Sequence, residues 1–163
     1  ALGEMVQDGI AILKVGPSLT GALREAVFLL AQIEEALAPR HGREGALGIA
    51  QALERAMLAN PVHWQGHYQG EESAVAFARR YSLLDRSRYY WAVPEVESAL
   101  RRLLSNLRAA PIPLALLSQH FPAQYGRVRD GALAADPEAI IRDRIRDVLR
   151  SYSAAAGSGP SPG

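Results

Sequence analysis

The sequence predicts an α/β fold. Two near-continuous apolar runs, residues 10–15 and 114–119, have the length and composition of parallel strands that are buried on both faces. Each run ends in polar side chains and is followed by a helical pattern, an alternation typical of α/β barrels. The chain has 163 residues, whereas a closed (β/α)8 barrel takes at least about 200. We therefore expect residues 1–152 to form the helix-rich C-terminal part of a TIM-type barrel.

The two ends of the chain differ from its middle. Residues 153–163 contain only alanine, glycine, serine and proline, which predicts a disordered tail. The first residue is alanine, and regular structure is expected almost at once. These features are typical of a piece of a longer protein.

The overall composition argues against several classes of partner. The net charge of +1 gives no electrostatic footprint for nucleic acid or for an anionic membrane. No apolar run approaches the roughly 18 residues of a membrane span. The absence of cysteine excludes disulfides and thiolate metal sites, and it fits a cytoplasmic protein.

The first expected strand leads to a candidate anion site. Lys14 lies near the C-terminal end of this strand, where α/β folds bind ligands, and Gly16 follows in the turn. An amphipathic helix is expected at residues 18–37, with Ser18 as its N-cap. The Gly16 backbone and the helix N-terminus suit an anion, although most strand-to-helix turns bind nothing.

Further helices are predicted from apolar residues at helical spacing. They cover residues 44–58, 71–81, 94–109 and 123–129, and Phe77 is expected to face inward. The last helix follows the start signal Asp136-Pro137 and runs to about Tyr152.

Two histidines between these helices have the spacing of a metal pair. His63 and His67 are four residues apart and would share a helix face. No glutamate follows His63 as in the H-E-x-x-H pattern, and no third ligand is placed by spacing. A packing or surface role is therefore favoured over a metal site.

Residues 81–91 are the most distinctive stretch of the chain. They contain two arginines, one aspartate and four aromatic residues in eleven positions. Arg86 and Arg88 offer planar forks of donors that suit a phosphate, and Asp85 can orient an arginine or accept from a hydroxyl. Tyr89 and its aromatic neighbours can form an apolar wall against a sugar ring. The alternative is a loop whose arginines pair with carboxylates and whose rings fill a core.

The second expected strand ends at Ser118 and Gln119. Parallel strands bind ligands at their C-terminal ends. These two side chains are therefore candidates for binding sugar hydroxyls.

Four motifs in order resemble one family, the GatZ/KbaZ-type subunit of class II D-tagatose-1,6-bisphosphate aldolase. The resemblance covers nearly the whole chain and matches the C-terminal portion of such a subunit. The motifs are Ile12 to Thr20 with Ala22 to Ala26, Tyr81-Ser82 with Asp85 to Trp91, Pro111 to Gln119, and Pro122 to Gly131.

The resemblance implies a TIM-barrel-like fold and an accessory role. Such subunits support the activity and stability of a separate zinc-dependent catalytic subunit, which cleaves tagatose 1,6-bisphosphate in galactitol and amino-sugar catabolism. An older label for the family is tagatose 6-phosphate kinase, but this sequence has no G-x-x-x-x-G-K-[ST] loop. Some relatives on this scaffold are regarded as metal-dependent ketohexose C4-epimerases, which is the alternative function.

The resemblance also favours a site at the strand ends over a plain loop. We expect Arg86, Arg88 and Tyr89 to hold a sugar phosphate or a partner carboxylate, with Lys14 as a second source of positive charge. Asp85 would position an arginine or serve as a general base. No metal ligands are assigned in this chain, and a divalent metal such as zinc is expected only in a full-length protein or in the catalytic partner.

Overall fold

The computed structural model describes residues 4–5, 8, 16–38, 48–109 and 111–157, and the regular structure within these ranges is helical. The principal elements follow one another as α2 (Ser18–Leu37), α3 (Ile49–Ala59), η2 (Pro61–His63), α4 (Glu72–Tyr81), η3 (Arg86–Tyr89), α5 (Pro94–Ala109), α6 (Leu114–His120), α7 (Pro122–Arg129) and α8 (Pro137–Gly157), where η marks a 3₁₀ turn.

The predicted strand at residues 114–119 is wrong, because this segment forms helix α6. Its sequence, Leu-Ala-Leu-Leu-Ser-Gln-His, contains good helix formers and no β-branched residue. A short apolar run does not distinguish a buried strand from a helix by periodicity, and here the propensities favoured the helix. The other predicted strand, residues 10–15, lies outside the described residues.

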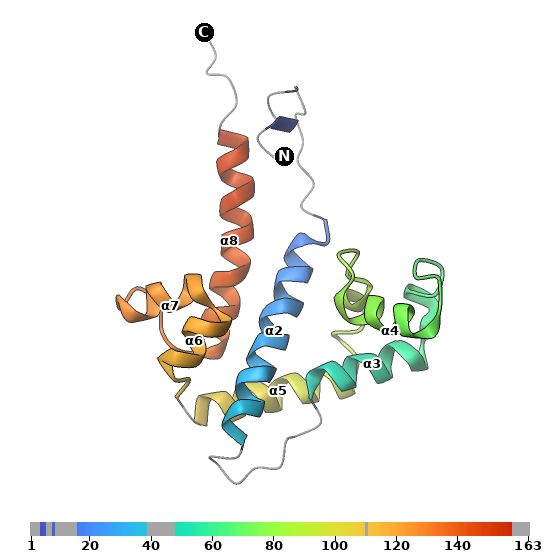
Figure 1. Ribbon diagram of the computed structural model, residues 1–163, viewed down its shortest axis with the longest axis horizontal. Helices are drawn as coiled ribbons and strands as arrows, with labels where there is room; N and C mark the ends of the chain where they lie inside the picture. Colours follow the sequence, from blue (N-terminus) through green and yellow to red (C-terminus); the bar gives the residue numbers. More distant parts are fainter. Residues whose placement is uncertain (1–3, 6–7, 9–15, 39–47, 110, 158–163) are drawn as a thin grey trace.

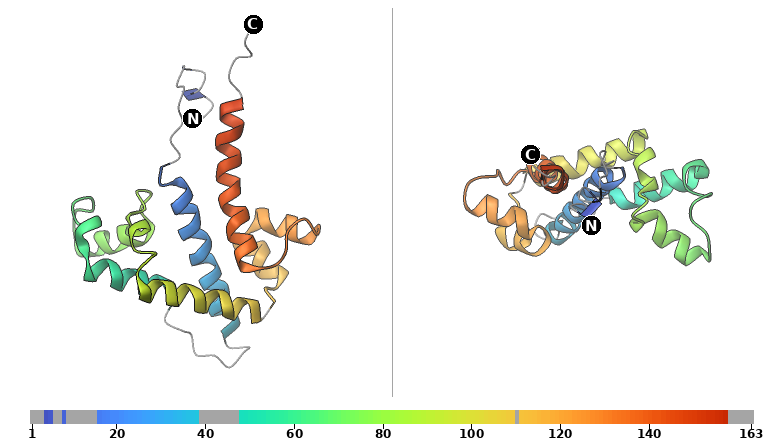
Figure 2. Two further views of the ribbon diagram at one scale, coloured as in Figure 1. Left: turned by 180° about the vertical axis from the view of Figure 1, so that it is seen from behind. Right: turned by 90° about the horizontal axis from the view of Figure 1, so that it is seen from above.

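Two long antiparallel helices, α2 and α8, lie side by side at the centre of the molecule (Figures 1 and 2). The hydroxyl groups of Ser18 and Tyr152 are 3.2 Å apart near one end of the pair. Arg144 forms an ion pair with Glu25 further along, at 3.1 Å. These contacts fix the register between the two helices.

The remaining helices lie around this pair. Helices α3 and α5 pack against each other and against α2, across one end of it (Figure 1). Helix α4 and the loop that follows it lie on one side of α2, whereas α6 and α7 lie on the opposite side with α8 (Figure 2). Helix α2 therefore separates the two peripheral groups.

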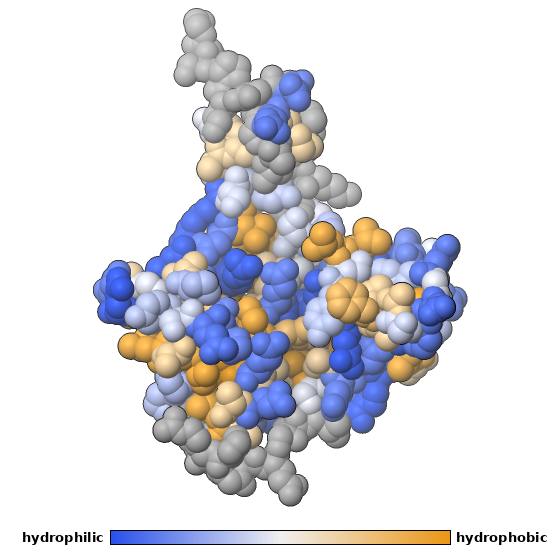
Figure 3. Space-filling view, viewed as in Figure 1, coloured by the Kyte–Doolittle hydropathy of each residue, from blue (hydrophilic) through white to orange (hydrophobic). Residues whose placement is uncertain are grey.

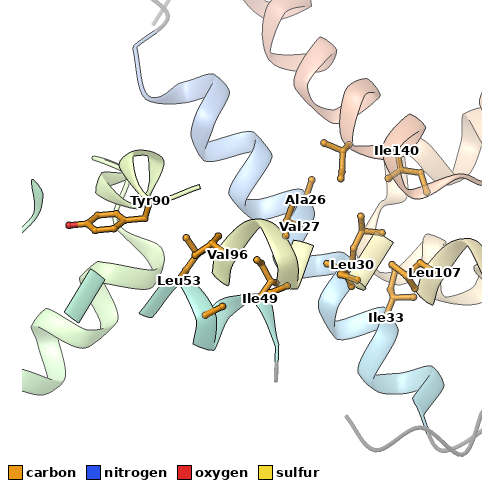
Figure 4. Packing of buried hydrophobic residues seen from close by; sticks show 14 of the residues in the cluster. Ala26, Val27, Leu30, Ile33, Ile49, Leu53, Tyr90, Val96, Leu107 and Ile140 are labelled. Atoms are coloured by element: carbon orange, nitrogen blue, oxygen red, sulfur yellow. The ribbon is translucent and has the colours of Figure 1, made fainter. Parts of the chain in front are cut away.

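The core follows α2 along its apolar stripe (Figure 4). Leu30, Ile33 and Leu37 are buried on this helix, as their spacing predicts. Val96 and Leu107 of α5 and Ile140 of α8 complete the same cluster. The buried stripes of α2, α5 and α8 thus join into one core. None of the described helices has the length and apolarity needed to cross a lipid bilayer.

The helix ends show which boundary signals were reliable. Asp136 caps α8, because its carboxylate accepts a hydrogen bond from the backbone N–H of Ala139 at 2.9 Å. The expected N-cap at Ser18 is wrong, since Ser18 is the first helical residue and Pro17 precedes it without a side-chain cap. Helix α8 continues to Gly157, so residues 153–157 are helical where a disordered tail was expected.

Helix α4 buries a charge instead of an aromatic ring. The prediction that Phe77 faces inward is wrong, because its side chain is 64% exposed. Arg79 is buried instead, and it donates to Glu54 of α3 at 2.7 Å and to Glu72 at 2.8 Å. Its guanidinium also lies over the ring of Trp64. This buried arginine fastens α4 to α3.

A second polar network joins α7 to α8. Arg127 of α7 pairs with Asp143 and with Asp147 of α8, the latter at 2.8 Å, and the Gln124 amide donates to both carboxylates. Partial burial alone would raise the pKa of Asp147. The hydrogen bonds from Arg127, Arg150 and Gln124 outweigh burial, and the pKa lies below its usual value.

We predict that Arg127→Ala lowers the free energy of unfolding by about 1–2 kcal/mol near neutral pH, a value discounted for partial exposure. A carboxyl group whose pKa is depressed in the folded state stabilises above its unfolded pKa, and this contribution is lost as the pH falls through the folded pKa. The difference between wild type and variant should therefore shrink in acid, as the pH falls through the lowered pKa of Asp147. Urea denaturation near neutral pH and in acid measures it.

The exposed Arg142 of α8 provides the matched control. Arg142→Ala should leave the unfolding free energy nearly unchanged at both pH values. A loss in Arg127→Ala that persists undiminished in acid would show that the ion pairs with Asp143 and Asp147 do not cause it.

Candidate functional site

The candidate site is the loop that leaves α4 and enters η3. Asp85 stands immediately before η3 with φ 45° and ψ 57°, the left-handed conformation. Aspartate tolerates this conformation better than most residues, although it still costs about 1 kcal/mol or more. It is the one residue other than glycine with a positive φ in the part of the chain that the structure describes. The turn at Asp85 sets the direction of the two arginines that follow.

Asp85 is held by a buried ion pair with Arg24 of α2. The exposed fractions of Asp85 and Arg24 are 0% and 3%. Nη1 of Arg24 lies 3.1 Å from Oδ1 of Asp85 and donates to the carbonyl of Ser82 at 2.9 Å. The Ser87 hydroxyl also donates to Oδ1, at 2.8 Å. A single guanidinium therefore ties both sides of the turn to α2.

Arg86 is fixed from both its backbone and its side chain. Its backbone N–H donates to the Tyr68 hydroxyl at 3.2 Å, and its Nε donates to the carbonyl of His63 at 2.6 Å. Its Nη2 lies 2.6 Å from Nε2 of His67. Since a guanidinium only donates, this contact requires Nε2 of His67 to be unprotonated.

Arg88 folds back over the same turn. Its Nη1 donates to the carbonyl of Leu84 at 2.6 Å and to that of Asp85 at 3.2 Å. Its Nη2 donates to the Tyr89 hydroxyl at 2.9 Å. This hydrogen bond and the positive charges of Arg88 and Arg86 lower the pKa of Tyr89 below its ordinary value.

Aromatic rings support the two arginines. The guanidinium carbons of Arg86 and Arg88 lie 5.1 Å and 4.6 Å from the centroid of the Tyr89 ring. The His63 ring stacks on Tyr89 at 4.6 Å. Tyr90 is buried and donates to the carbonyl of Asn60. The two tyrosines therefore have different roles: the exposed Tyr89 ring contacts both guanidinium groups, whereas Tyr90 is buried in the core.

Arg86 and Arg88 differ from Arg79 and Arg127 in their partners. In the described ranges Arg86 and Arg88 contact carbonyl oxygens, a histidine ring and a tyrosine hydroxyl, and neither forms an ion pair with a carboxylate. Arg79 and Arg127 each pair with two carboxylates. Two neighbouring guanidinium groups without a counter-charge suit an anion, and phosphate matches their planar donors.

The surface beside the arginines is partly apolar. Leu83 is 85% exposed, and Leu84, Tyr81 and Phe77 are also exposed. The rings of Phe77 and Tyr81 are in contact, with centroids 4.9 Å apart. Figure 3 shows apolar side chains at the surface in this region, between α2 and α4. A ligand at the arginines would therefore meet both charge and apolar surface.

The structure does not gather all the predicted site residues in one place. Ser118 and Gln119 lie on α6, across α2 from the loop that carries Arg86 (Figures 1 and 2). The Ser118 hydroxyl donates to the carbonyl of Ala115 within its own helix. The structure therefore does not place these two side chains beside the arginines, because the predicted strand is a helix on the other side of α2, and their binding role stays a prediction.

The remaining predicted residues have different outcomes. Gly16 is exposed at the turn before α2 with φ +53°, a conformation that favours glycine. Lys14 lies outside the described residues. A catalytic role for Asp85 stays a prediction, and in this conformation its carboxylate is buried and bound to Arg24.

Sequence reasoning missed Arg24 as part of the site, and for His63 and His67 it favoured a packing or surface role over a metal pair. An arginine inside an amphipathic helix gives no signal that it is buried, because its partner lies 61 residues away. His63 and His67 contact Tyr89 and Arg86, in agreement with the favoured role.

The described residues do not fit the zinc of a class II aldolase. Within residues 16–38, 48–109 and 111–157, no three histidine or carboxylate side chains are grouped as metal ligands would be. The carboxylates nearest the core, Glu54, Asp85 and Asp143, are each paired with an arginine. A metal in a full-length protein or in a catalytic partner stays a prediction.

Two comparisons identify what the chain is similar to. A family model described as D-tagatose-1,6-bisphosphate aldolase subunit GatZ/KbaZ-like matches residues 1–157. The chain is also 38% identical, with a TM-score of 0.85, to a solved structure of a probable tagatose 6-phosphate kinase from Sinorhizobium meliloti 1021. The match covers 94% of this chain and 39% of that one. This chain therefore spans well under half the length of that protein.

We predict that Arg88→Ala raises the pKa of Tyr89 toward the ordinary tyrosine value, because the variant removes the donor that stabilises the phenolate. Ultraviolet difference titration at the phenolate band measures it, with a Tyr89→Phe protein to assign the signal. The exposed Arg101 of α5 is the matched control. An equal titration curve in wild type and Arg88→Ala would contradict the contact between Arg88 and Tyr89.

Proposed function

The chain belongs to the D-tagatose-1,6-bisphosphate aldolase subunit GatZ/KbaZ-like family, and we propose from this premise that it serves as an accessory subunit of such an aldolase. In this role it supports the activity and stability of a separate catalytic subunit in galactitol and amino-sugar catabolism. The full role belongs to a longer polypeptide of the kind seen in the solved relative, of which the match covers 39%.

We also propose where the described helices belong in that longer protein. The high structural similarity over a minor share of the relative supports a helical portion of a larger fold. A TIM-type barrel would be the remainder of this fold. The finer placement, as the C-terminal part of the barrel domain itself, stays a prediction.

The proposal of a phosphate ligand rests on the positions of Arg86 and Arg88 and on their lack of a carboxylate partner among the described residues. They lie side by side around Tyr89, in a loop fixed by buried contacts, and among the described residues no carboxylate neutralises them. A phosphate group of a ketose bisphosphate would supply the missing negative charge and accept several of their N–H donors. The exposed Tyr89 ring and Leu84 would then contact the carbon chain of the sugar.

This ligand site would be smaller than the sequence predicts. Arg86, Arg88 and Tyr89 remain its members, while Ser118 and Gln119 belong to α6, on the other side of α2. Gly16, at the turn before α2, and Lys14, outside the described residues, are retained as candidate phosphate ligands. Asp85 serves the site by supporting the turn before Arg86.

We predict that Arg86→Ala and Arg88→Ala each weaken binding of tagatose 1,6-bisphosphate by about tenfold or more, because each removes charge-assisted hydrogen bonds. Isothermal calorimetry measures the dissociation constants. The exposed Arg101→Ala variant has the same loss of charge away from the site and should bind as wild type does. Unchanged affinity in both site variants would remove the assignment.

The accessory role has its own test. Adding the chain to a zinc-dependent catalytic subunit of tagatose-bisphosphate aldolase should lengthen the half-life of its activity during heating, because a partner that binds the native state stabilises it. An unrelated helical protein of equal concentration is the control. No change in half-life, or metal-dependent epimerisation of fructose by the chain alone, would contradict the proposal.

A further inference from the structure

We propose that Arg24 is a positioning residue, which fixes the direction in which Arg88 and Arg86 present their guanidinium groups. This inference rests on the proposed function of the pair as a phosphate site. Arg24 itself is buried on α2 and cannot contact a ligand. Its effect would pass through the turn at Asp85.

The first step is the contact between α2 and the turn. Nη1 of Arg24 reaches both the carbonyl of Ser82 and Oδ1 of Asp85, so one nitrogen bridges the start and the end of the turn. The second oxygen of Asp85, Oδ2, is buried and has no hydrogen-bond partner. Without Arg24, the carboxylate would be a buried charge with only the Ser87 hydroxyl to compensate it.

The second step is the backbone of the turn. The left-handed conformation of Asp85 is disfavoured by itself and persists only where its surroundings fix it. Arg24 and Ser87 both bind the carboxylate of this residue. Loss of the ion pair would release the strain and let the turn relax.

The third step connects the turn to the site. Nη1 of Arg88 binds the carbonyl oxygens of Leu84 and Asp85, which belong to the turn that Arg24 holds. If these carbonyls reorient, the guanidinium of Arg88 loses its support and its contact with the Tyr89 hydroxyl. Arg86 directly follows Asp85, so its backbone N–H would also lose its alignment with Tyr68.

The test variant is Arg24→Lys, which keeps the charge but loses the planar fork of donors. The affinity for inorganic phosphate should fall by about tenfold, with the helical circular dichroism retained. Arg24→Lys should cause no further loss when Arg86 and Arg88 are both replaced by alanine. Arg127→Lys is the control, because it weakens the ion pairs between α7 and α8, on the other side of α2 from the loop. It shows what a loss of stability alone does to phosphate binding.

The second readout does not depend on anion binding. In Arg24→Lys the pKa of Tyr89 should rise toward its ordinary value, because Arg88 no longer holds its hydrogen bond to the hydroxyl. A general loss of stability in Arg127→Lys should leave this pKa unchanged. The pKa of Tyr89 thus tests the positioning role of Arg24 by itself, whereas the affinity for phosphate also tests the proposed ligand.

The outcomes are distinguishable. Weaker phosphate binding together with a raised Tyr89 pKa supports the inference. If wild type does not bind phosphate but the Tyr89 pKa still rises in Arg24→Lys, the proposed function fails and the positioning role stands. If Arg24→Lys folds and neither the affinity for phosphate nor the pKa of Tyr89 changes, the positioning role of Arg24 is overturned. Should Arg24→Lys fail to fold, Asp85→Asn keeps the shape of the side chain and removes the charge that Arg24 pairs with, and an unchanged Tyr89 pKa there would equally overturn the inference.

Discussion

The candidate site depends on one buried ion pair, between Arg24 of α2 and Asp85 of the loop. Burial of two charges is costly, and it is tolerated only where hydrogen bonds satisfy the groups involved. Here the cost is partly offset by the Ser82 carbonyl and the Ser87 hydroxyl. The pair joins the central helix of the core to a surface loop, and thereby links the fold to the half-buried Arg86 and Arg88 beside it.

The same helix has two structural roles. One part of its surface packs along α8 and α5 and forms the core with Leu30 and Ile33. Arg24, one turn before Phe28, reaches the loop after α4. The core immobilises α2, so α2 is a rigid support. The contacts of Arg24 with Ser82 and Asp85 therefore hold the loop in a fixed position. This rigidity would reduce the entropy that the two arginines lose on binding the proposed anion.

The sequence predicts those features that depend on local pattern. Helices at residues 18–37 and 94–109 match α2 and α5 because their apolar stripes are long, and Asp136 caps α8 as expected. The short run at 114–119 was misassigned, since neither its length nor its apolarity separates strand from helix. The composition of residues 81–91 makes Arg86 and Arg88 candidates for the site, but the proposed role of Arg24 depends on a contact that only the fold creates.

The central claim is that Arg86 and Arg88 form an anion site that is preformed in the protein. A crystal structure of the chain grown with tagatose 1,6-bisphosphate tests it most directly. The account predicts a phosphate group within hydrogen-bond distance of both guanidinium groups, with the Arg24–Asp85 contact intact. A bisphosphate bound elsewhere on the molecule, or both arginines bound to carboxylates of a neighbouring segment, would contradict it.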